Sequence, residues 1–169
     1  MADRTEERTP LVDFQDLAGW TVEPMNGAGC DLVLSREQKM WGDYVGKLTY
    51  QMPPQPSPKK EGSSDGAAIV RPPKPMPIED GADCINMWIF GNLWEWAPEP
   101  GTPFLNISIL LQDKNGKEQA VPLTRLRWKE WWLTHKKLAE PMTSASFAGI
   151  KFEGINNAEP RSIYLGPLY

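Results

Sequence analysis

The clearest pattern in the chain is the alternation of apolar and polar positions in short runs. Within residues 104–112, positions 105, 107, 109 and 111 carry Leu, Ile, Ile and Leu, whereas the other face includes Asn106, Ser108 and Gln112. Because successive side chains of a strand point to opposite faces, this run predicts a strand with one apolar face. Residues 84–90 repeat the pattern, with an amide and two aromatic rings opposite the aliphatic face.

Ten runs of this kind predict an all-β protein. Seventeen prolines and fourteen glycines leave few windows in which an amphipathic helix of three turns fits. The predicted strands are 11–15, 30–36, 44–51, 67–71, 84–90, 104–112, 119–124, 131–138, 147–153 and 162–168. Ten short strands favour a two-sheet antiparallel β-sandwich of the jelly-roll type.

The same pattern predicts the domain organisation. Residues 1–10 form a polar tail, and residues 11–169 form one sandwich domain. Residues 52–66, rich in Pro, Ser, Gly and Lys, have nothing apolar to bury and predict a mobile protruding loop. The Asp-Lys-Asn-Gly sequence at 113–116 predicts a hairpin turn between two of the strands.

Charge and hydropathy exclude two kinds of partner. A net charge of -4 and no basic run longer than two residues argue against nucleic acid. No apolar run approaches the roughly 20 residues that cross a bilayer, so we expect no membrane partner either. The polar N-terminus lacks the hydrophobic segment of a signal peptide, and we interpret the sequence as a module from a longer exported protein, secreted, periplasmic or at the cell surface, and monomeric.

Catalytic constellations are missing from the sequence. His135 is the one histidine and falls in a predicted strand, which leaves little material for metal sites or Ser/His and Cys/His pairs. No phosphate-binding, CxxC, HExxH or GxSxG motif occurs. Glycoside hydrolysis needs two carboxylates across a cleft, and the pairs Glu95 and Glu99 or Asp80 and Asp83 fall in loops. We therefore expect no enzyme and no cofactor.

The tryptophans and cysteines need separate explanations. Eight tryptophans are several times the usual share, and we assign four or five of them to structural roles. Trp131 and Trp132 are adjacent in a strand, so at least one of them lies outside the core or under a loop. Cys30 and Cys84 permit one disulfide or two free thiols, and the count does not decide between these.

Loop tryptophans beside amide-bearing strands suit a sugar. A pyranose has an apolar face that stacks on flat rings and a belt of hydroxyls that pairs with amides or guanidinium groups. The sequence supplies both kinds of side chain, in Trp41, Trp88, Trp94, Trp96, Asn86, Asn92, Asn106, Gln112 and either Arg125 or Arg127. Each stack adds only about 0.5–1.5 kcal/mol beyond burial, so binding is weak unless several subsites act together.

Several segments, in order, resemble the galactose-binding-like jelly-roll domains. They are LVDFQDLAGW, GKLTY, WIFGN, the W-x-x-W-W entry to a strand, FAGIKFEG and SIYLGPLY, and the resemblance covers residues 11–169. Carbohydrate-binding modules attached to bacterial glycoside hydrolases and polysaccharide lyases belong to this group. The resemblance implies sugar binding either in the concave sheet, here Asn86, Trp88, Asn106 and Gln112, or in loops at one end, here Trp41, Asn92, Trp94 and Trp96. We favour the loop end, with Arg127 and the concave face contributing.

The resemblance also bears on calcium. Members of the group often hold a structural calcium through acidic residues at the places that Gln15 and Gly166 occupy here. A hard cation prefers charged oxygen ligands, so these two residues disfavour the ion, although Asp13 and Asp16 lie nearby.

We therefore predict a non-catalytic carbohydrate-binding module that brings an attached catalytic domain to a polysaccharide or oligosaccharide. Two alternatives remain. The first is a protein-interaction or assembly domain, in which exposed indoles bind another domain. The second is a jelly-roll polysaccharide lyase or glycoside hydrolase.

Overall fold

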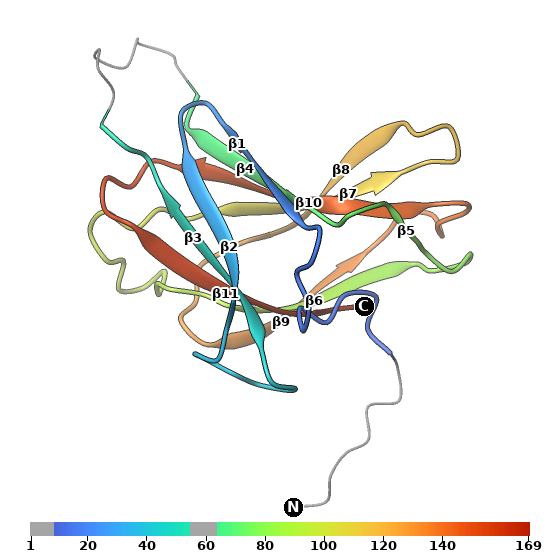
Figure 1. Cartoon of the computed structure of the whole chain (residues 1–169), viewed down its shortest axis with the longest axis horizontal. Helices are drawn as coiled ribbons and strands as arrows, with labels where there is room; N and C mark the ends of the chain where they lie inside the picture. Colours follow the sequence, from blue (N-terminus) through green and yellow to red (C-terminus); the bar gives the residue numbers. More distant parts are fainter. Residues whose placement is uncertain (1–8, 55–63) are drawn as a thin grey trace, which may run out of the picture.

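The computed structural model describes residues 9–54 and 64–169 and shows two antiparallel sheets packed face to face (Figure 1). The six-stranded sheet has the order β1-β4-β10-β7-β8, with β5 paired to β10, and the five-stranded sheet has the order β2-β3-β11-β6-β9. The strands are β1 (Thr21–Met25), β2 (Gly29–Ser35), β3 (Val45–Gln51), β4 (Gly66–Arg71), β5 (Met76–Pro77), β6 (Cys84–Phe90), β7 (Asn106–Gln112), β8 (Glu118–Arg125), β9 (Trp131–Lys137), β10 (Ser146–Ile155) and β11 (Arg161–Leu168). The predicted β-sandwich is confirmed.

The core lies between the two sheets. Leu48 of β3 and Ile163 of β11 meet Ile107 of β7 and Phe152 of β10 within one buried cluster, and none of these side chains is more than 1% exposed. The alternating pattern that predicted the strands therefore marks the surfaces that pack together.

The first predicted strand is wrong. Residues 11–15 make only an isolated bridge between Val12 and Leu168, and Phe14 has a φ of 56°, which no strand accommodates. The side chain of Asp13 accepts a hydrogen bond from the backbone N–H of Gln15, at 3.0 Å. Such a local bond competes with ladder pairing and turns the chain.

Strand β1 was not predicted from the sequence. It contains Pro24 and ends before the turn at Asn26 and Gly27, both of which have positive φ. A proline is tolerated there because β1 is an edge strand, paired on one side only, to β4.

The chain order hides which strands share a face. β6 and β7 follow one another in sequence, but β6 lies in the five-stranded sheet and β7 in the six-stranded sheet. Their outward faces are therefore on opposite sides of the sandwich. The predicted single concave site is wrong, because Asn86 and Trp88 lie on one outer face and Asn106 and Gln112 on the other.

Some predictions fall partly outside the described residues. Residues 1–8 of the predicted tail and residues 55–63 of the predicted loop lie outside them, and Gly66, placed in that loop, begins β4. No helix in the described part of the chain is long and apolar enough to cross a membrane. Cys30 and Cys84 are both free thiols, and burial raises the pKa of Cys30 to about 12, so this thiol stays protonated at neutral pH.

Candidate functional site

The outer face of the five-stranded sheet carries an aromatic cluster, here named the aromatic face. It consists of Trp88 and Phe90 of β6, Trp131 of β9 and Tyr164 of β11, all half-buried. The Phe90 ring lies edge-on to Trp131 and to Tyr164, with centroids 5.7 and 5.9 Å apart. Rings packed edge to face satisfy one another and present no common plane to a ligand.

Residues 36–44, which join β2 to β3 and are named here the covering loop, pack onto the aromatic face. The Trp41 ring stands edge-on to Trp88 at 5.2 Å. The backbone carbonyl of Gln38 accepts a hydrogen bond from Trp131 Nε1 at 2.8 Å. Trp41 is 44% exposed, so the loop covers the face without fully burying its own indole.

Charged and polar contacts hold the covering loop in place. Glu37 accepts hydrogen bonds from Lys47 Nζ at 2.6 Å and from the Tyr164 hydroxyl at 2.7 Å. The bond from Lys47, and then that from Tyr164, lowers the pKa of Glu37. The groups that could bind a ligand on this part of the sheet are therefore already paired with the protein's own loop.

Gln15 holds the other end of the covering loop, at the place where the resembled modules use a calcium ligand. Its Oε1 accepts hydrogen bonds from the N–H groups of Asp43 and Tyr44, at 2.8 and 3.1 Å, and its Nε2 donates to the Tyr44 carbonyl at 2.7 Å. A Cβ at Gly166 would lie 3.0 Å from one indole of the aromatic face. The described residues contain no group of three His, Cys, Asp or Glu side chains that could hold a metal ion, and the Gln15 side chain at this place is bonded to the covering loop.

Asn86 and Asn92 are engaged with their own domain. Asn86 Oδ1 lies 2.6 Å from His135 Nδ1 on the neighbouring strand β9. Asn92 is half-buried, and its Nδ2 donates to the Tyr50 hydroxyl at 2.7 Å and to the Ser162 carbonyl at 3.2 Å. The donor side of the Asn92 amide therefore fixes the end of the sandwich from within.

The connection from β6 to β7, residues 91–105 and named here the rim loop, presents a different aromatic arrangement. Trp94 packs against the core cluster, and Trp96 stacks on it with ring centroids 5.7 Å apart and an interplanar angle of 28°. Trp96 is 79% exposed. Because Trp94 backs one side of the Trp96 ring, the exposed surface includes its other side, and a flat apolar platform faces solvent.

The backbone and one ion pair fix this platform. The N–H groups of Leu93 and Glu95 donate to the carbonyls of Trp128 and Arg127 on the segment after β8, at 3.3 and 3.2 Å. Arg127 Nη1 lies 3.3 Å from the Glu95 carboxylate. Arg127, predicted to bind sugar, therefore sits beside the platform and pairs with Glu95, although both side chains are more than half exposed and the pair contributes little to stability.

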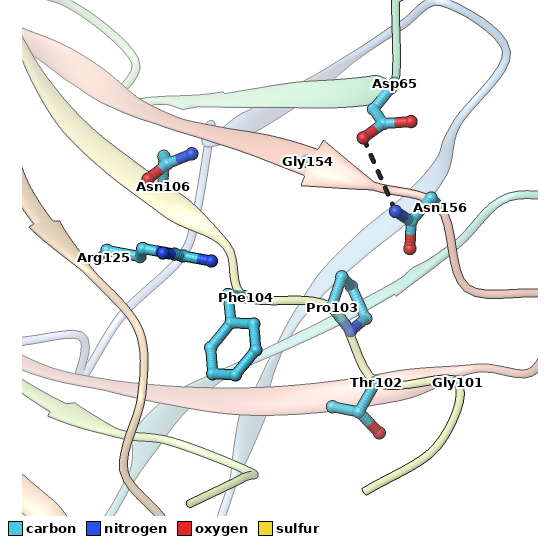
Figure 2. A pocket seen from close by; sticks show the side chains of 9 residues that line it. All are labelled: Asp65, Gly101, Thr102, Pro103, Phe104, Asn106, Arg125, Gly154 and Asn156. Carbon is cyan, nitrogen blue, oxygen red and sulfur yellow. Dashed lines mark hydrogen bonds between the residues drawn. The ribbon is translucent and has the colours of Figure 1, made fainter. Parts of the chain in front are cut away.

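The second half of the rim loop lines a cavity of about 530 Å³, here named the rim cavity (Figure 2). Thr102, Pro103 and Phe104 form one wall, while Asn106 and Arg125, a cross-strand pair of β7 and β8, form another. The remaining lining residues are Asp65, Gly101, Gly154 and Asn156. Its volume falls within the roughly 300–1,000 Å³ typical of small-molecule sites.

Polar groups converge on the rim cavity from distant parts of the chain. The Arg125 guanidinium lies 4.7 Å from the Phe104 ring centroid. Asn156 Nδ2 lies 3.5 Å from the Asp65 carboxylate on the far side. Gly154, with a φ of 95°, coincides with an irregularity in the pairing of β10 with β4, and the resulting bend shapes the wall.

Gln112 lies away from this site. It lines an open cleft of about 1,070 Å³, here named the edge cleft, between β8 and β9 and the segment that follows β9.

Trp132, 54% exposed, projects from β9 toward Trp128, with ring centroids 6.4 Å apart. Trp131 and Trp132 thus both lie outside the central core, as their adjacency required of at least one.

The predicted site residues therefore form three groups. Trp94, Trp96 and Arg127 meet at the rim loop, with Asn106 in the cavity that this loop lines. Trp88 belongs to the aromatic face, which Trp41 covers, and Asn86 lies on the same side of β6, while Gln112 lines the edge cleft. Asn92 stands apart from these groups, bonded to Tyr50 and Ser162. Sequence reasoning missed Asp65, Thr102, Phe104 and Asn156, since only the fold brings residues so far apart to one cavity. Two hints were available in the sequence. Asn106 lies on the polar face of an alternating strand, and Arg125 was one of two arginines that could supply a guanidinium group.

Comparison with known proteins gives a fold. No protein-family model matches the sequence, and no curated protein sequence matches it. Among solved structures, one from a study of the promiscuous specificity of β-sandwich carbohydrate-binding modules superposes with a TM-score of 0.62 at 15% identity, covering 94% of this chain and 60% of that one. This chain thus spans less than two thirds of that structure.

For two further structures, the match to this chain covers nearly their whole length. TmCBM61, in complex with β-1,4-galactotriose, has a TM-score of 0.50 at 13% identity, covering 94% of this chain and 97% of that one. The family 11 module of the cellulosomal cellulase Lic26A-Cel5E of Clostridium thermocellum has a TM-score of 0.50 at 12% identity, with 95% and 91% covered. This chain has the β-sandwich fold of these carbohydrate-binding modules.

Proposed function

We propose that the protein is a non-catalytic carbohydrate-binding module that holds an attached enzyme at a polysaccharide. The observation that carries this proposal is the Trp96 ring, 79% exposed and stacked on Trp94 at the rim of a rigid sandwich. An exposed indole is costly in water, and burial of its free face by an apolar ligand recovers that cost. The apolar face of a pyranose has the shape and chemistry for this contact.

The rim cavity supplies the polar half of the recognition. The rim loop provides the indole platform and also lines the cavity, where the Asn106 amide and the Arg125 guanidinium are available. Planar amide and guanidinium groups make paired hydrogen bonds with neighbouring hydroxyls. A glycan that stacks on Trp96 and also reaches the cavity would therefore meet two subsites built on the same loop.

The carboxylates support binding without catalysis. Among the described residues that line the rim cavity, Asp65 is the one carboxylate, whereas hydrolysis at a glycosidic bond uses two facing carboxyl groups. Glu95 is paired with Arg127 beside the platform. The solved modules with this fold include one from a cellulase, and we extend that arrangement to an exported parent protein here.

The test is affinity electrophoresis through gels that contain soluble polysaccharides, together with a glycan array. We expect the wild-type protein to be retarded by at least one polysaccharide and Trp96→Ala to migrate freely. Trp132→Ala is the matched control, because it removes another exposed indole, on β9, that takes no part in the stack of Trp96 on Trp94. Retention that is lost in Trp132→Ala and kept in Trp96→Ala would contradict the proposed platform.

One observation favours a protein-interaction domain as the second candidate. The edge cleft is open and contains apolar residues such as Leu111, Val121 and Met142. The edge strand β9, whose end lines the cleft, also exposes Trp132 near its start. An apolar groove and an exposed indole along one edge strand are typical of a protein contact. A blank glycan array together with a Trp132-dependent complex between this domain and its own parent protein would favour that function.

A further inference from the structure

We infer that the rim cavity recognises the carboxylate of an acidic sugar, so that the glycan is one that contains uronate units. This inference rests on the proposed carbohydrate-binding function and specifies its ligand class. It starts from Arg125, whose guanidinium stands in the cavity between Asn106 and Phe104 (Figure 2).

Arg125 differs from the other arginines beside strands of the six-stranded sheet. Arg71 is paired with Glu23 and Glu118, and Arg127 is paired with Glu95. Within residues 9–54 and 64–169, no carboxylate pairs with Arg125. Its guanidinium instead contacts the Phe104 ring, a neutral group.

That contact orients the charge. The guanidinium carbon lies 4.7 Å from the Phe104 ring centroid, which restricts the side chain and leaves the N–H groups along the guanidinium edge available. This fork of N–H donors matches the two oxygens of a carboxylate. A single hydroxyl has one oxygen and cannot pair with both arms of the fork. Asn106, directly across the ladder from Arg125, adds an amide next to the fork.

A second guanidinium lies behind the cavity wall. Arg161 Nε donates to Thr102 Oγ1 at 2.8 Å, and Thr102 lines the cavity. Arg125 in the cavity and Arg161 behind its wall therefore place two guanidinium groups close to this site, in a chain whose net charge is -4. The local field is more favourable to an anion than the overall charge predicts.

The opposite wall fits the rest of the sugar. Asn156 has an amide oxygen that can accept a hydrogen bond from a ring hydroxyl, and a uronate unit carries a carboxylate and free hydroxyls on the same ring. The cavity is large enough, at about 530 Å³, for a sugar unit with its bound water. The Trp96 platform, on the same loop, would then take another unit of the same glycan.

The experiment compares each acidic ligand with its uncharged methyl ester. Trimers of galacturonate, glucuronate and mannuronate, each as the free acid and as its methyl ester, are titrated calorimetrically into the wild-type protein, Arg125→Gln and Lys114→Gln. Lys114 lies in the turn after β7, at the end of that strand away from Asn106. Lys114→Gln is therefore a control that removes one positive charge far from the cavity. Arg125 is exposed, so Arg125→Gln should keep the wild-type melting temperature.

We expect at least one free acid to bind the wild-type protein about tenfold more tightly than its methyl ester, the effect of one charge-assisted pair. Arg125→Gln should remove that difference, and Lys114→Gln should keep it. The preference should also weaken as salt is raised.

The two proposals fail in distinguishable ways. If every acid binds no more tightly than its ester while neutral glycans bind, the acidic-sugar inference is wrong and carbohydrate binding stands. If the preference exists but survives in Arg125→Gln, the assignment to the rim cavity is wrong. If no glycan binds on the array or in solution, the proposed function is wrong and the inference falls with it.

Discussion

The aromatic face and the rim loop use the same residue type in opposite ways. On the aromatic face, Trp88 and Trp131 are half-buried, packed edge to face and covered by residues 36–44. On the rim loop, Trp96 lies parallel to Trp94 and is largely open to solvent. The difference shows that an indole on a sheet face is not a binding platform merely because it points outward. What matters is whether its flat side is left free.

Removal of an indole from the aromatic face should cost the most stability. Trp88→Ala deletes a half-buried ring that supports Trp41, and we expect a loss of about 2–3 kcal/mol in unfolding free energy, below the value for a fully buried Trp. Urea titration measures this loss. Leu133→Ala, opposite Trp88 on β9 and 41% exposed, is the control and should change stability by less than about 1 kcal/mol. Equal losses would remove the distinction between the two regions.

The opposite result is expected at the rim. Trp96→Ala should weaken glycan binding by roughly 10- to 30-fold, about 1.5–2 kcal/mol, because the stack and its apolar burial are lost. Unfolding free energy should change by less than about 0.5 kcal/mol. Trp94→Ala should lose both binding and stability, since Trp94 also packs against the core. A large stability loss in Trp96→Ala alone would mean that its ring is buried in solution.

The covering loop can be loosened without touching an aromatic ring. Gln15→Ala deletes three hydrogen bonds to the backbone of Asp43 and Tyr44, and we expect a loss of about 1–2 kcal/mol. Hydrogen exchange should rise in residues 36–44 and stay unchanged in the rim loop. Exchange that rises equally in both places would show that the two regions are coupled.

The smallest effect concerns pH. The bonds from Lys47 and Tyr164 lower the pKa of Glu37, so their stabilising contribution is complete above the ordinary glutamate value of 4.5 and is lost as pH falls through the lower folded value. Glu37→Gln should therefore flatten the acid side of the stability profile slightly, relative to wild type. Thermal melts across the acid range test this. Identical acid profiles of the two proteins would mean that the Glu37 carboxylate does not form these hydrogen bonds in solution.

Prediction from sequence succeeded where a pattern is local. Nine of the ten predicted runs coincide with strands, and the Asp-Lys-Asn-Gly turn forms, with Asp113 Oδ1 accepting from the N–H groups of Asn115 and Lys117 at 2.8 and 2.9 Å. It failed at residues 11–15, where aspartate side chains bond to nearby backbone and turn the chain. An apolar run alone does not reveal that competition.

The candidate site was only partly predictable, for a related reason. Proline and glycine around Trp94 and Trp96 marked a loop, and a loop is where an indole can stay open. Asn86 and Asn106 show the same alternation in consecutive strands, yet the strands belong to different sheets. Alternation gives the side of a strand and not the sheet that the strand joins.

The sequence by itself determined the all-β class, most strand positions and the excess of indoles beyond the needs of one core, because periodicity and turn chemistry act over a few residues. Only the tertiary structure decided which indoles are covered and which are open. It also brought Asp65, Asn106, Arg125 and Asn156 around one cavity. Sheet order and loop packing depend on contacts between residues far apart in the chain, and no local pattern encodes them.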